Sequence, residues 1–300
     1  MSEKIENLLG EDRTFDPPSS IVENANATQE WFDLANEDRL AYWQKQALER
    51  ITWYKEPKEI LDDSDAPFYK WFKDGELNLA YNCLDRHLET DGDRIAFYWE
   101  GEPGDSQEIT YQDLYERVCK LSNGLKELGV KKGDRIAIYL GMTPEIVISM
   151  LACARIGAVH SVVFGGFSAE ALADRINDAE AKVVITADGA WRRGDIVPLK
   201  QNVDDSLKLT DHIESVIVVK RTENEVTMVD GRDYWYSELV DKQEADCEPE
   251  VMNAEDMLYI LYTSGTTAKP KGIVHTQAGY LTGVTTTHSA VFDVKEDDIY

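Results

Sequence analysis

From residue 108 onward, short apolar runs alternate with amphipathic stretches of helical periodicity. Strands that read as continuous apolar runs are typical of a parallel sheet buried on both faces, with the intervening helices as its cover. The sequence therefore predicts an α/β fold made of βαβ units. The predicted strands span 135–140, 161–164, 183–186, 215–219 and 257–262, and the predicted helices span 111–128, 144–156, 169–181 and 199–207.

The first 107 residues have a different composition. Residues 1–30 are polar, contain the run Pro17-Pro18-Ser19-Ser20, and are predicted to form a flexible leader. Residues 31–107 are rich in aromatic side chains. Because large rings bury much apolar area, we expect this extension to wrap around the main body. A helix from Asn36 to Ile51 is predicted within it, with Asn36 as its N-cap.

The charge of the chain restricts its partners. Lys and Arg total 31 against 57 Asp and Glu, a formal net charge of −26. This argues against nucleic acid or an anionic membrane as a partner, because both require a basic surface. The charge is compatible with small anionic ligands, since a few local cations and backbone N–H groups suffice to hold them. Such acidity also predicts a halophilic protein, because a cytosol of high ionic strength screens carboxylate repulsion.

Neither a secretory signal nor a membrane span is expected. The longest apolar stretch, residues 146–154, is far below the ~20 residues that a span requires. The four cysteines (Cys83, Cys119, Cys153 and Cys247) are widely spaced, with no C-x-x-C pair. Buried or idle thiols in a reducing compartment are therefore predicted, and not a disulfide framework or a zinc site. We expect a cytoplasmic protein.

The strand predicted at 257–262 leads into a loop, residues 263–272, with the sequence TSGTTAKPKG. Its hydroxyl side chains, glycines and lysines can place O–H, N–H and cationic groups around a concavity suited to a polyphosphate. It is not a Walker A loop, because no G-K-[ST] follows a glycine at the required spacing. On composition alone, a hinge between two sub-domains with solvated lysines is the alternative.

The residue order of this loop resembles the phosphate-loop motif of the adenylate-forming superfamily, [ST]-S-G-[ST]-T-G-x-P-K-G. Further stretches at 68–72, 81–87, 99–105, 154–168 and 198–204 resemble the acetyl-CoA synthetase family within that superfamily. Ala268 departs from the motif, which usually has glycine there; at a positive φ its Cβ would cost roughly 1–2 kcal/mol. The resemblance implies that the phosphates of ATP are bound by Thr263, Ser264, Gly265, Thr266, Thr267, Lys271 and Gly272.

A second candidate site follows the strand predicted at 183–186, in the sequence DGAWRRGD of residues 188–195. Ligand sites of open α/β sheets lie at this end of the strands. On spacing alone, a paired arginine on a loop is a surface salt-bridge donor, and Gly165-Gly166 is a strand-to-helix turn; both alternatives stay open. The resemblance instead implies a coenzyme A site, with Arg192, Arg193, Gly194 and Asp195 near its phosphates and Gly165 and Gly166 in close approach. Asp195 stands where the family often carries a cation.

The resemblance also implies the chemistry. ATP, together with Mg²⁺, activates acetate to acetyl-adenylate with release of pyrophosphate, and coenzyme A then takes the acetyl group with release of AMP. The partners implied are therefore small molecules: acetate, ATP and coenzyme A. Propionate or another short-chain acid is an alternative substrate, and a non-catalytic nucleotide- or coenzyme A-binding fragment is the alternative outside enzymes.

The chains of this family are longer than 300 residues. The resemblance implies the N-terminal large domain of the adenylate-forming fold, with parallel sheets flanked by helices, truncated before the mobile C-terminal domain. Residues 108–240 are expected to form an α/β sub-domain with the coenzyme A loops, and residues 241–300 to begin a second one with the phosphate loop. No catalytic residue or metal ligand is predicted here, and the Mg²⁺ ligands are expected elsewhere. These 300 residues alone are expected to be inactive. No oligomeric state is predicted.

Overall fold

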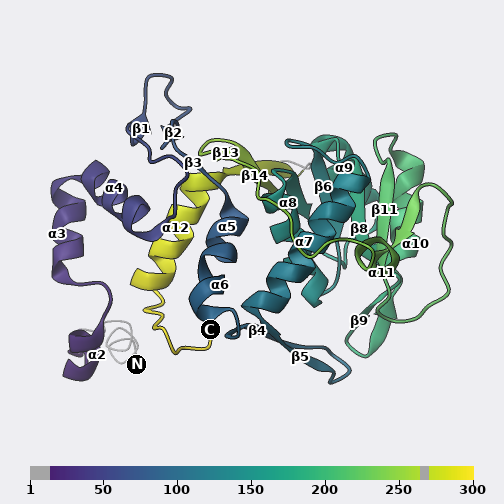
Figure 1. Ribbon diagram of the computed structural model, residues 1–300, viewed down its shortest axis with the longest axis horizontal. Coiled ribbons are helices and arrows are strands. Elements are labelled where there is room, and N and C mark those ends of the chain that lie inside the picture. The colour runs from purple at the N-terminus through teal and green to yellow at the C-terminus, as the bar shows by residue number, and fades with distance from the viewer. Residues whose placement is uncertain (1–13, 264–269) are drawn as a thin grey trace, which may run out of the picture.

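A computed structural model describes residues 14–263 and 270–300 of the chain (Figure 1). Its centre is a seven-stranded sheet with the strand order β12-β11-β8-β6-β7-β14-β15. All neighbouring strands from β12 to β14 are parallel, and β15 is antiparallel to β14. The strands are β6 (Arg135–Tyr139), β7 (Val159–Val162), β8 (Val183–Ala187), β11 (Ser215–Val219), β12 (Asp233–Trp235), β14 (Met257–Thr263) and β15 (Lys271–Thr276). The α/β prediction is confirmed.

Helices cover both faces of this sheet. Contacts of α7 with α8 and α11, and of α9 with α10, assign these helices to two groups. Consecutive parallel strands are joined by crossover helices, and these connections are right-handed. Because β7 and β8 lie on opposite sides of β6, such connections place α8 and α9 on opposite faces of the sheet. The helices are α7 (Tyr111–Glu127), α8 (Pro144–Arg155), α9 (Ala169–Ala179), α10 (Leu199–Ser206), α11 (Tyr236–Val240) and α12 (Gln277–Ala290), with a 3₁₀ turn at Leu207–Leu209.

The helix ends follow local sequence signals. The hydroxyl of Thr110 accepts from the N–H of Asp113 and starts α7, while Gly129, at a φ of 85°, follows its end. The hydroxyl of Ser168 caps α9 in the same way by accepting from the N–H of Ala171. These caps are why the predicted starts of α7 and α9 agree with the structure.

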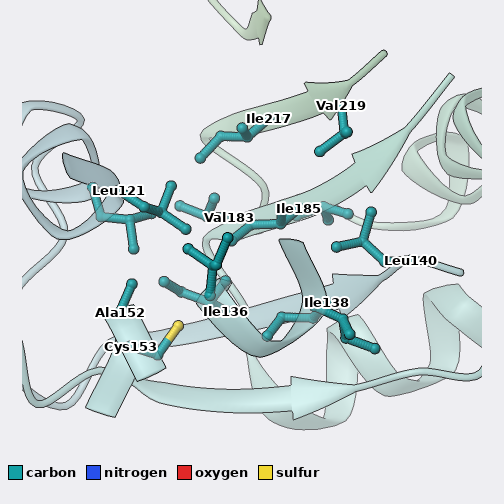
Figure 2. Packing of buried hydrophobic residues seen from close by; sticks show 14 of the residues in the cluster. Leu121, Ile136, Ile138, Leu140, Ala152, Cys153, Val183, Ile185, Ile217 and Val219 are labelled. Atoms are coloured by element: carbon teal, nitrogen blue, oxygen red, sulfur yellow. The ribbon is translucent and has the colours of Figure 1, made fainter. Parts of the chain in front are cut away.

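The main hydrophobic core lies between the central strands and their helices. Every residue of β8 and β11 is buried, which is why both strands read as unbroken apolar runs. Three of the four cysteines are buried, and all four are free thiols. Figure 2 shows how side chains from neighbouring strands and from α7 and α8 interdigitate, among them Leu121, Ile136, Ile138, Leu140, Ala152, Cys153, Val183, Ile185, Ile217 and Val219.

The N-terminal segment contains two helices where one was predicted from Asn36 to Ile51. The break is at Asp38, whose extended backbone ends the first helix and whose carboxylate accepts from the N–H groups of Leu40 and Ala41 to start the second. The cap is therefore Asp38 and not Asn36. The elements before the sheet are α2 (Ser19–Asn24), α3 (Gln29–Glu37), α4 (Arg39–Arg50), β1 (Leu61–Asp62), β2 (Lys70–Trp71), β3 (Glu76–Leu77), α5 (Leu79–Cys83), α6 (Asp85–Asp91), β4 (Ile95–Glu100) and β5 (Ser106–Thr110).

A buried ion pair joins this segment to the sheet domain. The guanidinium of Arg155, at the end of α8, is 1% exposed and donates to both carboxylate oxygens of Asp85 on α6, at 2.8 and 2.9 Å. These hydrogen bonds raise the pKa of Arg155 against the opposing effect of burial. Removing one partner of such a pair leaves an uncompensated buried charge, so the pair fixes α6 against α8.

The remaining prediction about domains concerns the boundary between residues 240 and 241. After this boundary the chain forms β13 (Met252–Asn253), which pairs with β3, and then β14 and β15, which join the same sheet as the strands of 108–240. The division of the chain into sub-domains stays a prediction.

Candidate functional site

A cavity of about 810 Å³ opens at the edge of the sheet where the parallel strands β6, β7 and β8 end. Open α/β sheets hold ligands at this edge. Its walls are mostly apolar residues and glycines, and the charged residues that line it are Glu100, Glu102, Arg192 and Arg221. The lining comes mainly from residues 100–102, 140–143, 162–166 and 190–192.

Three of the predicted coenzyme A residues meet at this cavity. Arg192 lies on β9 (Ala190–Arg192), which forms a hairpin with β10 (Asp195–Val197). Its guanidinium carbon is 4.8 Å from the centre of the Phe164 ring. A Cβ added to Gly166 would lie only 2.1 Å from Nη1 of Arg192, and one added to Gly165 would lie 3.1 Å from the carbonyl oxygen of Leu140. The two glycines therefore leave space for the guanidinium and for the neighbouring backbone.

Tyr139 holds the turn that carries these glycines through hydrogen bonds. This side chain is buried at the end of β6, and its hydroxyl lies 2.7 Å from the carbonyl oxygen of Phe167 and 3.2 Å from that of Gly165. The same hydroxyl accepts from the side-chain amide of Asn202 at 3.2 Å. Burial raises the pKa of Tyr139, so it stays a neutral donor.

The other three predicted residues lie on the hairpin but do not line the cavity. Arg193 and Gly194 form its tip with φ angles of 56° and 83°. Asp195 is the antiparallel partner of Arg192. The N–H of Gly194 donates to Oε1 of Glu102. The backbone N–H at the hairpin tip is thus already bonded to a carboxylate of the protein.

Arg221 is a lining residue that the sequence analysis missed. It follows β11, at the same edge of the sheet, and its guanidinium carbon is 5.1 Å from the centre of the Trp99 indole. It donates to both carboxylate oxygens of Asp105, at 2.7 and 3.0 Å. These hydrogen bonds lower the pKa of Asp105. The rule that pointed to Arg192, a basic residue after a predicted strand, also points to Arg221.

The predicted phosphate residues divide between described and undescribed parts of the chain. Ser264, Gly265, Thr266 and Thr267 lie outside the described residues, as do Ala268 and Lys269. Thr263 ends β14 and is the register partner of Lys271, which begins β15. Lys271 and Gly272 therefore belong to a strand and not to a loop, because the β-branched residues Ile273 and Val274 after them continue the pairing. Since β14 is parallel to β7, this end of β14 lies at the same edge of the sheet as the cavity.

The end of β14 is also fixed from the side by α9. The hydroxyl of Tyr262 donates to Oδ2 of Asp178 at 2.7 Å, and the guanidinium carbon of Arg175 is 5.5 Å from the Tyr262 ring centre. Burial, and then the hydrogen bond to Asp178, raise the pKa of Tyr262. The residue before Thr263 therefore has a defined position.

Across residues 14–263 and 270–300, no group of three or more His, Cys, Asp or Glu side chains is arranged to hold a metal ion. In the same part of the chain, no helix has both the length and the apolar composition needed to cross a membrane.

Known protein families match nearly the whole chain. Residues 84–300 match the family described as AMP-binding enzyme, and residues 17–83 match the family described as Acetyl-coenzyme A synthetase N-terminus. The chain is similar to the Acetyl-coenzyme A synthetases of Streptomyces avermitilis, with 58% identity over 301 residues, and of Pasteurella multocida, with 53% identity over 300 residues. These matches cover 100% and 98% of this chain and, in both cases, 46% of the relative. The chain thus spans about half the length of these curated relatives.

Proposed function

Because the chain belongs to the family of AMP-binding enzymes, we propose that it carries the ATP-phosphate and coenzyme A sites of an AMP-forming acetate–CoA ligase. In this reaction a carboxylate oxygen of acetate attacks the α-phosphorus of ATP, and pyrophosphate leaves with the electron pair of the broken P–O bond. The thiol sulfur of coenzyme A then attacks the acetyl carbon of acetyl-adenylate, the thiol proton is lost, and AMP leaves. Acetate, ATP with its Mg²⁺, and a cytoplasmic location belong to this proposal.

The observation that carries the proposal is the shared edge of the sheet. Arg192 lies in the cavity beyond β7, and Thr263 and Lys271 lie at the end of the neighbouring strand β14. Leu261 of β14 lines the cavity, so the two candidate sites adjoin. A reaction in which ATP and coenzyme A react in turn with one acyl group requires such adjacent sites.

The described residues suit the two ligands in different ways. The Lys271 ammonium and the Thr263 hydroxyl would bind the β- and γ-phosphates and neutralise charge as pyrophosphate leaves. The Arg192 guanidinium would donate charge-assisted hydrogen bonds to a phosphate of coenzyme A. The apolar walls of the cavity would accommodate the less polar pantetheine arm.

The test is exchange of labelled pyrophosphate into ATP by the complete protein, with acetate or propionate as the acid. Acetate-dependent exchange, followed by thioester formation when coenzyme A is added, is expected. Faster exchange with propionate would reassign the substrate. Binding of coenzyme A without exchange would support a non-catalytic binding module and contradict the ligase.

A further inference from the structure

Asp188 connects two segments that leave the sheet at the cavity edge. It follows β8 directly and is 1% exposed. Its Oδ1 accepts from the backbone N–H groups of Gly189, Arg221 and Thr222 at 2.7, 2.8 and 3.0 Å, and from the Thr222 hydroxyl at 3.2 Å. One carboxylate oxygen thus ties the chain after β8 to the chain after β11.

The close approach of these two segments is confirmed by Gly189. A Cβ added there would lie 2.4 Å from Oγ1 of Thr222, 3.0 Å from Nδ2 of Asn224 and 3.0 Å from Cγ2 of Ile196. The N–H of Asp188 also donates to the carbonyl oxygen of Val219, at 2.9 Å. A side chain at residue 189 would therefore require the side chain of Thr222, and those of Asn224 and Ile196, to move.

Each of the joined segments carries one of the two arginines of the cavity. Arg192 lies four residues after Asp188 on β9, and Arg221 itself donates its backbone N–H to Asp188. Both side chains line the same cavity. Arg221 is paired with Asp105, so Asp188 ties the segment of Arg192 to a segment that an ion pair also holds.

We propose that Asp188 is a positioning residue of the cavity, which ties the segment of Arg192 to the segment of Arg221 so that the Arg192 guanidinium faces an anionic ligand while Arg221 stays paired with Asp105. That ligand is a phosphorylated nucleotide, the nucleotide end of coenzyme A, and this assignment rests on the proposed function. A ligand that meets an arginine already in place loses less free energy to ordering the site.

The test is a double-mutant cycle on coenzyme A affinity, measured by calorimetric titration of the chain. Asp188→Ala is expected to weaken binding about tenfold, in line with the loss of hydrogen bonds to a charged group. Asp188→Asn keeps the shape and one acceptor oxygen and is expected to restore part of the affinity. If Asp188 acts through Arg192, the effect of Asp188→Ala shrinks in an Arg192→Ala background. Equal fold-changes in both backgrounds would overturn the proposal.

A matched control separates positioning from general stability. Asp233 is also a buried aspartate, in an ion cluster with Lys200 and Arg232, but it begins β12 at the opposite edge of the sheet. Asp233→Asn is expected to lower the melting temperature without changing coenzyme A affinity. An equal loss of affinity in this variant would assign the Asp188 effect to stability alone.

Amide hydrogen exchange tests the positioning without any ligand. In Asp188→Ala, the amides of Gly189, Arg221 and Thr222 are expected to exchange at least tenfold faster, while those of the core strand β6 stay protected. In Asp188→Asn, which keeps one acceptor oxygen, the increase is expected to be smaller. Unchanged exchange at these three amides would overturn the positioning role. Faster exchange in a chain that does not bind coenzyme A would support that role and contradict the proposed function.

Discussion

Thr263 and Lys271 face each other as antiparallel partners at the ends of β14 and β15. The end of β14 and the start of β15 therefore lie side by side. Tyr262, held by Asp178 and Arg175, fixes one side of this exit. The hydroxyl of Thr263 and the ammonium of Lys271 thus come from neighbouring strands at the edge where a ligand would bind.

Lys271→Ala is expected to depress acetate-dependent pyrophosphate exchange by about 10- to 100-fold in the complete protein. A charge-assisted hydrogen bond of about 1.5–3 kcal/mol would be lost from the transition state. Because Lys271 is exposed, its removal leaves folding almost unchanged. The melting temperature and the exchange rate check both statements. Lys45→Ala, another exposed lysine, is the control, and normal exchange in Lys271→Ala would refute the phosphate assignment.

Arg192→Ala is expected to raise the KM for coenzyme A at least tenfold while leaving pyrophosphate exchange nearly intact. Arg192 lines the cavity, whereas Arg193 lies at the hairpin tip. Arg193→Ala is therefore expected to have the smaller effect, and the double variant to resemble Arg192→Ala. Steady-state kinetics with varied coenzyme A measure the difference. A fall in exchange as large as that in thioester formation would show that the arginines serve the nucleotide or the fold.

Gly166→Ala is expected to weaken coenzyme A binding without unfolding the chain. The new methyl group would meet the end of the flexible Arg192 side chain and, at 2.6 Å, Cε1 of the Phe164 ring. Both are side chains that can move. The displaced guanidinium would leave its place over the Phe164 ring. Calorimetric titration and the melting temperature distinguish the two effects. Affinity equal to that of the parent chain would show that Arg192 does not bind the ligand from this position.

His160 is expected to make the fold less stable in acid. Burial lowers the pKa of His160 to about 4, from an ordinary value of 6.5. Between these two pKa values the unfolded chain binds the proton more readily than the folded chain does. The contribution of His160 to the unfolding free energy is therefore complete above pH 6.5 and is lost as the pH falls toward 4. The slope is at most about 1.4 kcal/mol per pH unit.

His160→Phe isolates this contribution. Phenylalanine can keep the stacking of residue 160 on Tyr259, whose ring centre is 5.5 Å away, but it cannot take up a proton. Denaturant unfolding at pH 4.5 and pH 7 is expected to show a smaller loss of stability in the variant. The same pH dependence in both proteins would mean that His160 does not titrate in this range.

Salt is expected to stabilise the chain. A net charge of −26 strains the compact state in dilute buffer. The Debye length falls from ~10 Å at 0.1 M to ~3 Å at 1 M, so added KCl removes most of the repulsion. The melting temperature should therefore rise between about 0.1 and about 1 M KCl, because the screening of charge repulsion increases over this range. Greatest stability in dilute buffer would contradict a halophilic protein.

The sequence by itself determined five of the seven strands of the central sheet and the starts of the helices α7, α8, α9 and α10. β8 and β11 are recognisable because strands covered on both faces must be apolar throughout, and Thr110, Ser168 and Gly129 mark helix ends through contacts with their near neighbours in the chain. The motif order around residue 263 and the arginines after β8 also pointed to the edge of the sheet at which the cavity opens. These features depend on local interactions or on one repeated pattern.

Only the tertiary structure decided which residues meet at that edge. The strand β15 exists because Lys271–Thr276 pairs with β14, and no local signal gives that partner. Arg192 and Arg193 are adjacent in the sequence, but only the guanidinium of Arg192 lies against Phe164 and Gly166. Asp188 and Arg221 are 33 residues apart and meet through one hydrogen bond. Such pairings depend on the path of the chain between distant strands, which is set by packing and not by the composition of either segment.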